Sequence, residues 1–181
     1  KLTPRDFELA WMCPYRFVPA CSPHLAARLA RRKIRAARIT SAFRRLAALY
    51  DAVIVEGAGG VLAPIDGEHT MLEIMKALRL PVLLVARSGL GTLNHTLLSL
   101  RELRRAKVKV VGVVLVDSRP GKPGFIEKDN VRTIEEMSGV KVLARLPYKK
   151  RPDVRKLARH LNPVLERLGH SSIRADSAQG L

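Results

Sequence analysis

Short apolar runs divide the chain at regular intervals. They cover residues 52–55, 80–86, 108–116 and 140–146 and are rich in valine, leucine and isoleucine. Runs of this length and composition are typical of strands buried on both faces of a parallel sheet. Helical spacing of apolar residues follows each run, so a strand–helix unit is repeated along the chain with right-handed crossovers. The pattern predicts an α/β fold with a mostly parallel, doubly wound sheet.

Helical spacing also precedes the first run, over residues 24–49, with a break expected near residues 39–41. Ser22 and Pro23 suit the cap and the first turn of this helix. Further along, Thr70 stands three residues before Glu73, which predicts a capping box at the start of another helix.

Two more helices are predicted, over residues 130–137 and 153–168, the first of them stopped at residues 138–139. We find no internal repeat and no linker, so residues 1–168 are expected to form a single domain. Residues 169–181 are polar and are predicted to be a disordered tail.

The first candidate site lies where the first apolar run ends. Glu56 comes directly after the run, and glycines stand at positions 57, 59 and 60. Ligands of open α/β sheets bind at the carboxyl ends of strands. A glycine turn offers backbone N–H groups to a phosphate, and an acidic side chain beside it can hold Mg²⁺. The alternative, a sheet-edge turn with a solvated glutamate, stays open.

A second candidate site follows the second run. Residues 87–95 contain Gly89 and Gly91 and lead into a helix. Free N–H groups and the positive end of the helix dipole make such a start an anion site. The alternative is an ordinary connection between a strand and a helix, with Thr92 as the helix cap.

The composition limits the number of domains and the class of protein. The chain has 181 residues, of which 47% are hydrophobic, which is enough for one domain with a core. No run approaches the length of a membrane span. The sequence begins with Lys1 and not with an initiator methionine, and no signal-peptide pattern follows. We therefore expect it to be a piece of a longer chain. Cys13 and Cys21 could pair but lack metal or redox spacing, and reduced thiols in the cytoplasm are expected.

The formal net charge of +17 is unevenly distributed. Between Leu9 and Tyr50 there is no Asp or Glu, while basic residues crowd residues 28–45. Such a stripe is typical of a nucleic-acid footprint, but also of a solvated helix face or a surface for nucleotides or an acidic partner. Aromatic residues make up only 4% of the chain and few lie among the arginines. The composition therefore disfavours nucleic acid as a partner.

The chain contains the four motifs Ser22-Pro23-His24, Glu56-Gly57-Ala58-Gly59-Gly60, Leu80-Pro81-Val82 and Leu90-Gly91-Thr92-Leu93-Asn94-His95. Together they resemble dethiobiotin synthetase, the ATP-dependent enzyme of biotin synthesis. The similarity runs from about Pro14 to Tyr148, in the order and at the approximate spacing of that family. E-G-A-G-G alone is shared with P-loop amidoligases that make cobyrinic acid diamides, and L-G-x-x-N-H narrows the resemblance.

The resemblance implies a P-loop NTPase-like fold and a ligase that acts in the cytoplasm as a homodimer. In this reaction CO₂ adds to an amine of 7,8-diaminopelargonate to give a carbamate. ATP phosphorylates the carbamate, and the second amine then closes the ureido ring with loss of phosphate. The γ-phosphate needs charge neutralisation, which Mg²⁺ supplies, and the carbamate needs close positioning.

The resemblance also implies roles for individual residues. Glu56 would be a Mg²⁺ ligand, and Gly57, Ala58 and Gly59 would line the nucleotide and carbamate region. The substrate carboxylate would be held at the homodimer interface by Leu90, Gly91, Thr92, Leu93 and Asn94. The nucleotide base would lie near Val116, Asp117, Leu146, Pro147 and Tyr148.

The chain departs from the family pattern in two ways. The family begins with a G-x-x-x-x-G-K-[ST] phosphate loop, a catalytic lysine and a Mg²⁺-binding aspartate, and no glycine precedes Gly57 here. No catalytic residue is therefore assigned. The family also has an adenine-reading Asn where this chain has Val116, followed by Asp117. Valine offers no such hydrogen bonds, which leaves base selectivity open.

Three hypotheses follow. The first is a dethiobiotin synthetase homologue whose first strand and phosphate loop are missing from this chain. The second is a degenerate or split homologue that binds a ligand or partner without catalysis, and the third is a basic nucleic-acid-binding α/β module. Since the phosphate loop is missing, we expect these 181 residues alone not to hydrolyse ATP by the family mechanism. An exposed sheet edge beside the missing strands would favour pairing with another chain.

Overall fold

The computed structural model describes residues 9–151, 153 and 159–169. Contacts divide the chain into two compact units, Lys1–Leu80 and Pro81–Leu181, and each is described here by itself. The single domain expected for residues 1–168 stays a prediction. The predicted tail, apart from Gly169, lies outside the described residues.

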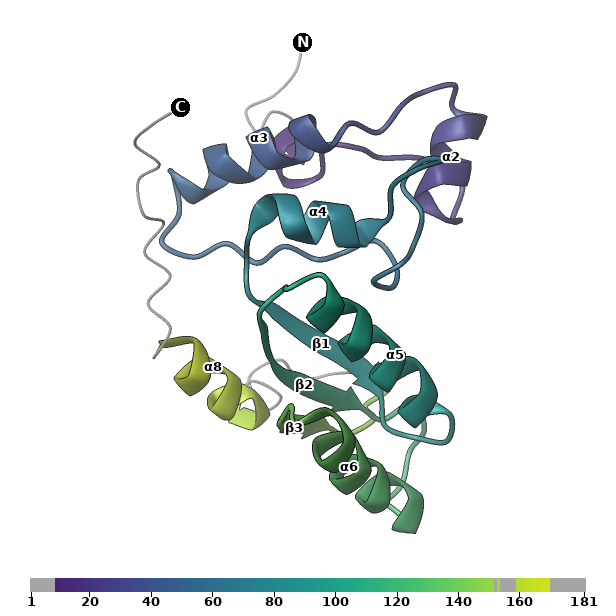
Figure 1. Ribbon diagram of the computed structural model, residues 1–181, viewed down its shortest axis with the longest axis vertical. Helices are drawn as coiled ribbons and strands as arrows, with labels where there is room; N and C mark the ends of the chain where they lie inside the picture. The colour runs from purple at the N-terminus through teal and green to yellow at the C-terminus, as the bar shows by residue number, and fades with distance from the viewer. Residues whose placement is uncertain (1–8, 152, 154–158, 170–181) are drawn as a thin grey trace. The chain divides into compact units, whose positions relative to one another are not determined.

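In the described part of the first unit, helices α2 (Pro23–Leu29), α3 (Ala36–Ala47) and α4 (Met71–Leu78) follow a helical stretch at residues 9–12 (Figure 1). Pro23 occupies the first turn of α2 as predicted, whereas the Ser22 side chain makes no capping hydrogen bond. The break predicted near residues 39–41 is wrong, because the helix is interrupted at residues 30–35. Arg31 has a left-handed backbone with φ of 50°, which ends α2 inside a run of like charges.

The core of this unit lies between α3 and α4. Ile65, Met71 and Ile74 are buried together, and Ile39 of α3 packs against them, so the residues predicted to break the helix instead anchor it. The predicted capping box at Thr70 and Glu73 is confirmed. Cys13 and Cys21 are both free and exposed.

The strand predicted at residues 52–55 is wrong, because this segment has no regular secondary structure. Ile54 is 96% exposed and Val55 42% exposed, so the run is not buried on either face. A strand gains its hydrogen bonds from a neighbouring strand, and among the described residues of this unit the structure has no strand beside it. The apolar run therefore signals a capacity for strand formation that is not realised here.

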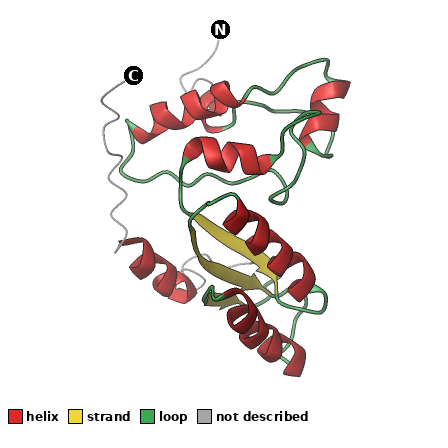
Figure 2. Cartoon of the chain, viewed as in Figure 1, coloured by secondary structure: helices red, strands yellow, loops and turns green. Residues whose placement is uncertain are grey.

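The second unit contains a three-stranded parallel sheet in the order β1-β2-β3 (Figures 1 and 2). The sheet confirms the three later strand predictions and the parallel direction. The observed strands begin about two residues later than predicted, a usual uncertainty of element ends. The elements are β1 (Val82–Arg87), α5 (Thr92–Arg105), β2 (Val110–Val116), α6 (Phe125–Ser138), β3 (Val142–Leu146), η1 (Arg159–Leu161) and α8 (Asn162–Gly169).

Helices α5 and α6 pack against each other and on the sheet, as Figure 1 shows. The core between them consists of Leu100, Val113, Leu115 and Ile134, which are at most 4% exposed. Helix α8 contacts β2 and β3, and its Val164 is buried. The α/β fold class is therefore confirmed.

Strand β1 is not buried on both faces as predicted, since Val85 is 60% exposed. It is an edge strand of the described sheet, with β2 on one side. Helix α6 begins at Phe125, five residues before the predicted start at Asn130, because Glu127 accepts a hydrogen bond of 2.8 Å from the Gly124 N–H at its first turn. None of the helices in the described part of the chain is long and apolar enough to cross a membrane.

Candidate functional site

The Glu56–Gly60 segment of the first unit takes its shape from its glycines. Glu56 is exposed at the end of the irregular apolar run. A Cβ added at Gly57 would lie 3.5 Å from the terminal methyl carbon of Met71. Gly59 has a left-handed backbone with φ of 92°, and an added Cβ there would lie 3.0 Å from the Cβ of Ala63. The segment thus makes a turn that a side chain at Gly59 would strain.

Backbone hydrogen bonds join this turn to α4. The Ala63 N–H donates to the Gly60 carbonyl over 2.9 Å, and the Met71 N–H donates to the Ala63 carbonyl over 2.9 Å. Pro64 and Thr70 form an isolated antiparallel bridge. The turn is therefore held by the start of α4 and not by a sheet.

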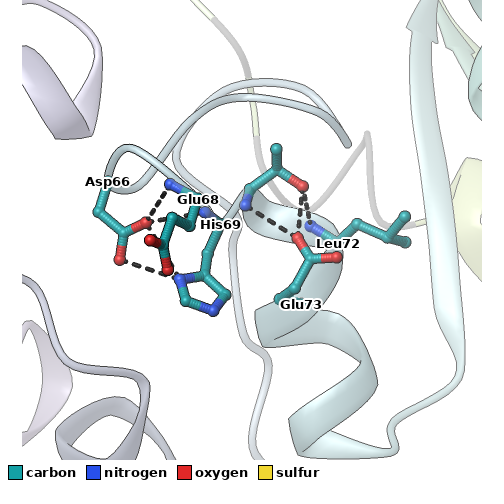
Figure 3. A network of polar contacts seen from close by, with 6 residues as sticks. Asp66, Glu68, His69, Leu72 and Glu73 are labelled. Carbon is teal, nitrogen blue, oxygen red and sulfur yellow. Dashed lines mark hydrogen bonds and ion pairs between the residues drawn. The ribbon is translucent and has the colours of Figure 1, made fainter.

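Two carboxylates fix the connection between the turn and the helix (Figure 3). Oδ1 of Asp66 accepts the N–H groups of Glu68 at 2.9 Å and His69 at 2.7 Å. Glu73 accepts the Thr70 N–H at 2.8 Å and the Thr70 hydroxyl at 2.7 Å. The Glu68 N–H holds the pKa of Asp66 below its usual value, and the Thr70 hydroxyl does the same to the pKa of Glu73.

The second candidate turn lies in the second unit, between β1 and α5. Gly91 caps α5 with a left-handed φ of 91°, so the cap is not Thr92 as one alternative held. Thr92 is fully buried, and its hydroxyl lies 2.9 Å from the hydroxyl of Thr96. Its N–H donates to the Gly89 carbonyl over 3.2 Å.

The predicted anion-binding residues therefore differ in exposure. Leu90 is 89% exposed and Asn94 is exposed, whereas Leu93 packs against the core. Because Thr92 uses its hydroxyl and its N–H internally, the groups left to meet an anion are the N–H groups of Leu93 and Asn94 in the first turn. The helix start keeps its positive dipole end.

A buried polar cluster lies at the carboxyl ends of all three strands. Asp117 follows β2 and is 9% exposed. Arg145 of β3 donates to both of its carboxylate oxygens, from Nε to Oδ1 at 2.8 Å and from Nη2 to Oδ2 at 2.6 Å. The Ser88 hydroxyl, at the end of β1, donates to Oδ1 at 2.5 Å. Asn130 of α6 donates to the Ser88 carbonyl at 2.8 Å.

The residues predicted to lie near the nucleotide base meet at this same sheet edge. Val116 pairs with Leu146 across β2 and β3, and the Asp117 N–H donates to the Leu146 carbonyl over 2.9 Å. Pro147 is half-buried and Tyr148 is 38% exposed. Asp117 has both oxygens engaged by Arg145 and Ser88, so its carboxylate is occupied by protein donors.

An open groove of about 590 Å³ lies in the second unit along α5 and α6. Across it, the Arg104 guanidinium donates to the Ser138 carbonyl. Leu93 and Asn94, two of the predicted substrate residues, stand among its lining residues. The lining is formed by Leu93, Asn94, Leu97, Leu98, Leu100, Arg101, Arg104, Met137 and Ser138.

Similarity to known proteins decides the family. Residues 3–154 match the family described as an AAA domain. An ATP-dependent dethiobiotin synthetase BioD from Anaeromyxobacter dehalogenans strain 2CP-1 is 42% identical over 154 residues, which are 85% of this chain and 68% of that relative. The chain belongs to the dethiobiotin synthetase family. The relative of that name from Halalkalibacterium halodurans is 33% identical over 163 residues, covering 86% of this chain and 66% of the relative.

Membership in the dethiobiotin synthetase family confirms the resemblance drawn from the sequence motifs and the P-loop NTPase-like class. The site roles remain predictions. Gly57, Ala58 and Gly59 stand with Glu56 in the first unit, and the remaining predicted site residues stand in the second unit. Within the second unit, the base-region residues gather at one sheet edge.

The Mg²⁺ that the sequence resemblance implies would require oxygen ligands. In the described part of the chain, no three His, Cys, Asp or Glu side chains gather as a metal-binding group. Mg²⁺ bound to a nucleotide uses one or two carboxylates together with phosphate oxygens and water. Glu56, an exposed single carboxylate beside a glycine turn, fits such a partial ligand set.

Sequence reasoning missed Ser88, Arg145 and Asn130, which hold the strand ends together. Ser88 and Arg145 each stand near the carboxyl end of a predicted strand. Because ligands of open α/β sheets bind at such ends, this position was a signal that could have revealed them. Asn130 was predicted only as a helix start, and its bond to Ser88 spans 42 residues. No local pattern carries a contact of that separation.

Proposed function

We propose that this chain takes part in the ATP-dependent conversion of 7,8-diaminopelargonate and CO₂ to dethiobiotin. The observation that carries the proposal is the 42% identity to a dethiobiotin synthetase across 85% of the chain, which includes both glycine turns. An amine of the substrate adds to CO₂ with loss of a proton, giving a carbamate. Its oxygen takes the γ-phosphoryl group of ATP, and the second amine displaces phosphate to close the ring.

Glu56 is the residue we assign to Mg²⁺, which when bound neutralises charge on the nucleotide phosphates. The left-handed turn at Gly59 and the close approach of Gly57 to α4 keep backbone free of side chains beside that carboxylate. A phosphate or carbamate oxygen can therefore approach the N–H groups of residues 57–59. This arrangement supports nucleotide binding at the turn.

The start of α5 is the place we assign to the substrate carboxylate. Two N–H groups of its first turn, those of Leu93 and Asn94, have no acceptor within the helix. The exposed Leu90 and Asn94 flank this point, and the apolar groove along α5 begins at Leu93. The aliphatic chain of 7,8-diaminopelargonate would have an apolar wall there, and its carboxylate would have the helix dipole.

The sheet edge at Val116, Leu146 and Pro147 is the place we assign to the nucleotide base. These three side chains are apolar, and the neighbouring Asp117 carboxylate is already bound by Arg145 and Ser88. A flat apolar contact fits a purine ring, and Tyr148 adds an exposed aromatic side chain. Cytoplasmic location and a homodimer with the substrate at its interface belong to the same proposal.

The experiment is dethiobiotin formation from 7,8-diaminopelargonate, bicarbonate and MgATP by the native protein that carries this chain. Glu56→Ala should lower kcat by about two orders of magnitude, as expected when a metal ligand is lost at a phosphoryl-transfer site. Glu68→Ala is the matched control, since Glu68 is also an exposed glutamate close in sequence. Equal activity in both variants, or no product from the native protein, would contradict the proposal.

A further inference from the structure

Three aromatic side chains from residues 11–17 lie against arginines of the basic segment. The Cζ of Arg32 lies 5.8 Å from the ring centroid of Tyr15 and 5.6 Å from that of Phe17. The two rings are stacked, with centroids 6.4 Å apart and planes inclined by 14°. The Cζ of Arg38 lies 5.3 Å from the Tyr15 centroid. Tyr15 therefore holds two guanidinium groups at cation–π distance.

The same arrangement continues along α3. The Cζ of Arg45 lies 4.7 Å from the ring centroid of Trp11. The Tyr15 hydroxyl accepts the Arg35 N–H over 2.9 Å at the start of the helix. At 100° per residue, the positions of Arg35, Arg38 and Arg45 fall within an arc of about 80° on one side of α3.

These contacts define a basic–aromatic surface in the first unit, made of Trp11, Tyr15, Phe17, Arg32, Arg35, Arg38 and Arg45. Sequence reasoning found few aromatics among the arginines because these aromatics precede them in the chain. All four arginines are exposed, and the rings are half-buried beneath them. An aromatic ring beside a guanidinium leaves its charge intact, as it does at Arg32 and Arg38.

The segment of sequence that forms this surface carries charge of one sign. Residues 9–50 contain no Asp or Glu. They contain nine basic residues, all exposed: Arg16, Arg28, Arg31, Arg32, Lys33, Arg35, Arg38, Arg44 and Arg45. Like charges at this density repel one another, and a polyanion that binds here relieves that repulsion while releasing its own counterions.

We propose that the basic–aromatic surface binds single-stranded nucleic acid, as a property separate from the proposed reaction. A row of arginines matches a polymer with one phosphate per unit, and guanidinium forks bind phosphate oxygens bidentately. Guanidinium planes held against aromatic rings also offer flat faces on which unpaired bases stack. The half-buried rings leave no protruding aromatic anchor for a bilayer, so a lipid surface fits this surface less well.

The test is fluorescence anisotropy of a labelled oligouridylate of about 15 nucleotides, which covers a usual single-strand site. Saturating MgATP is present, so the proposed nucleotide site is occupied. Affinity should fall with salt, with a slope of log K against log salt of about −0.7 for each phosphate contact. Four contacting arginines predict a slope of about −3.

Two matched variants separate this surface from the general charge of the protein. Arg32→Gln/Arg38→Gln/Arg45→Gln should weaken binding at least about tenfold and make the slope shallower by about 2. Lys107→Gln/Lys109→Gln/Lys128→Gln removes the same charge from exposed positions of the second unit and should change the affinity less than about twofold. Tyr15→Leu, which keeps every charge, should lower the affinity and leave the slope unchanged, whereas Tyr15→Phe should keep the affinity.

Three results would overturn the proposal. Equal losses in the two triple variants would mean attraction to net charge alone. A duplex of the same phosphate number binding as tightly would remove the role of unpaired bases. Binding to phosphatidylserine vesicles or to polyglutamate through the same arginines, with no binding to the oligouridylate, would assign the surface to a lipid or an acidic protein. Circular dichroism of each variant distinguishes loss of binding from loss of folding.

Discussion

The two glycine turns have the same sequence signature but different structures. Each follows an apolar run, yet residues 52–55 form no strand, whereas Val82–Arg87 is a strand paired with β2. The turn after β1 leads directly into α5 and lies beside the buried Ser88 and Asp117. The turn at Glu56 is instead joined by backbone bonds to the start of α4. An apolar run followed by glycines thus predicts a strand only where a neighbouring strand completes it.

The largest expected effect is on stability, from a substitution in the polar cluster beside the turn that follows β1. Arg145→Ala leaves the buried Asp117 carboxylate without its bidentate partner, and loss of one member of a buried pair costs about 3–5 kcal/mol. Urea unfolding followed by circular dichroism should show this loss. Arg132→Ala, which removes an exposed pair with Glu136, should leave the unfolding midpoint almost unchanged. If both variants unfold alike, the cluster is not what holds the strand ends.

The second expected effect compares the glycines themselves. Gly91→Ala meets no atom within 4 Å but places a side chain at φ of 91°, which costs about 1–2 kcal/mol at the start of α5. In thermal unfolding, Gly60→Ala should cost far less, since its backbone is not left-handed and nothing lies within 4 Å of an added Cβ. Equal melting temperatures for the two variants would mean that the left-handed cap of α5 is not required.

The third expected effect tests what supports the Glu56 turn. Thr70→Ala removes the side chain that caps α4 and binds Glu73, at a cost of about 1 kcal/mol. Because Met71 of α4 lies beside Gly57 and the Met71 N–H bonds to the Ala63 carbonyl, proteolysis near residues 56–60 should become faster. Thr133→Ala is the control, since Thr133 is a half-buried threonine whose hydroxyl donates to Asp129 within α6. Faster cleavage in the control alone would refute the link from α4 to the turn.

The smallest expected effect is on pH dependence. The pKa values of Asp66 and Glu73 in the first unit are lowered by hydrogen bonds, and the Val142 N–H lowers the pKa of Glu135 in the second unit. A carboxyl with a lowered folded pKa contributes stability above its unfolded pKa and loses it as the pH falls through the folded value. Stability should therefore decline below about pH 4.5. Asp66→Asn and Glu73→Gln should each flatten that decline in urea titrations, and an unchanged decline would show that other groups cause it.

The sequence predicted the second unit better than the first because its elements follow local patterns. Three apolar runs became parallel strands, and the helix start at Gly91 lies where the glycine loop was expected. The failures lie where distant partners decide the outcome. In the described part of the first unit, residues 52–55 have no strand beside them. Ile39, which looked like part of a break, is half-buried and packs against Ile65 and Ile74.

The candidate site residues also divide into those that a local pattern predicts and those that depend on distant contacts. The turns at Glu56 and Gly91 could be predicted because glycine spacing is visible in the sequence. The partners of Asp117 could not, since Ser88 and Arg145 are 29 and 28 residues away along the chain. The aromatic contacts of Arg32 and Arg45 were missed for the same reason, because Tyr15 and Trp11 stand outside the basic segment.

Asp117 is bonded through both its backbone and its side chain. Its N–H donates to Leu146, and its carboxylate receives Arg145 and Ser88, so solvent reaches that amide only if the ends of β2 and β3 part and a charge is uncovered. The Asp117 amide should therefore exchange with deuterium as slowly as the most protected amides of the sheet, although it stands one residue beyond the strand. Strand ends usually fray, whereas this one would stay closed. Slow exchange at Asp117 would show that this sheet edge is a rigid surface for a bound nucleotide base.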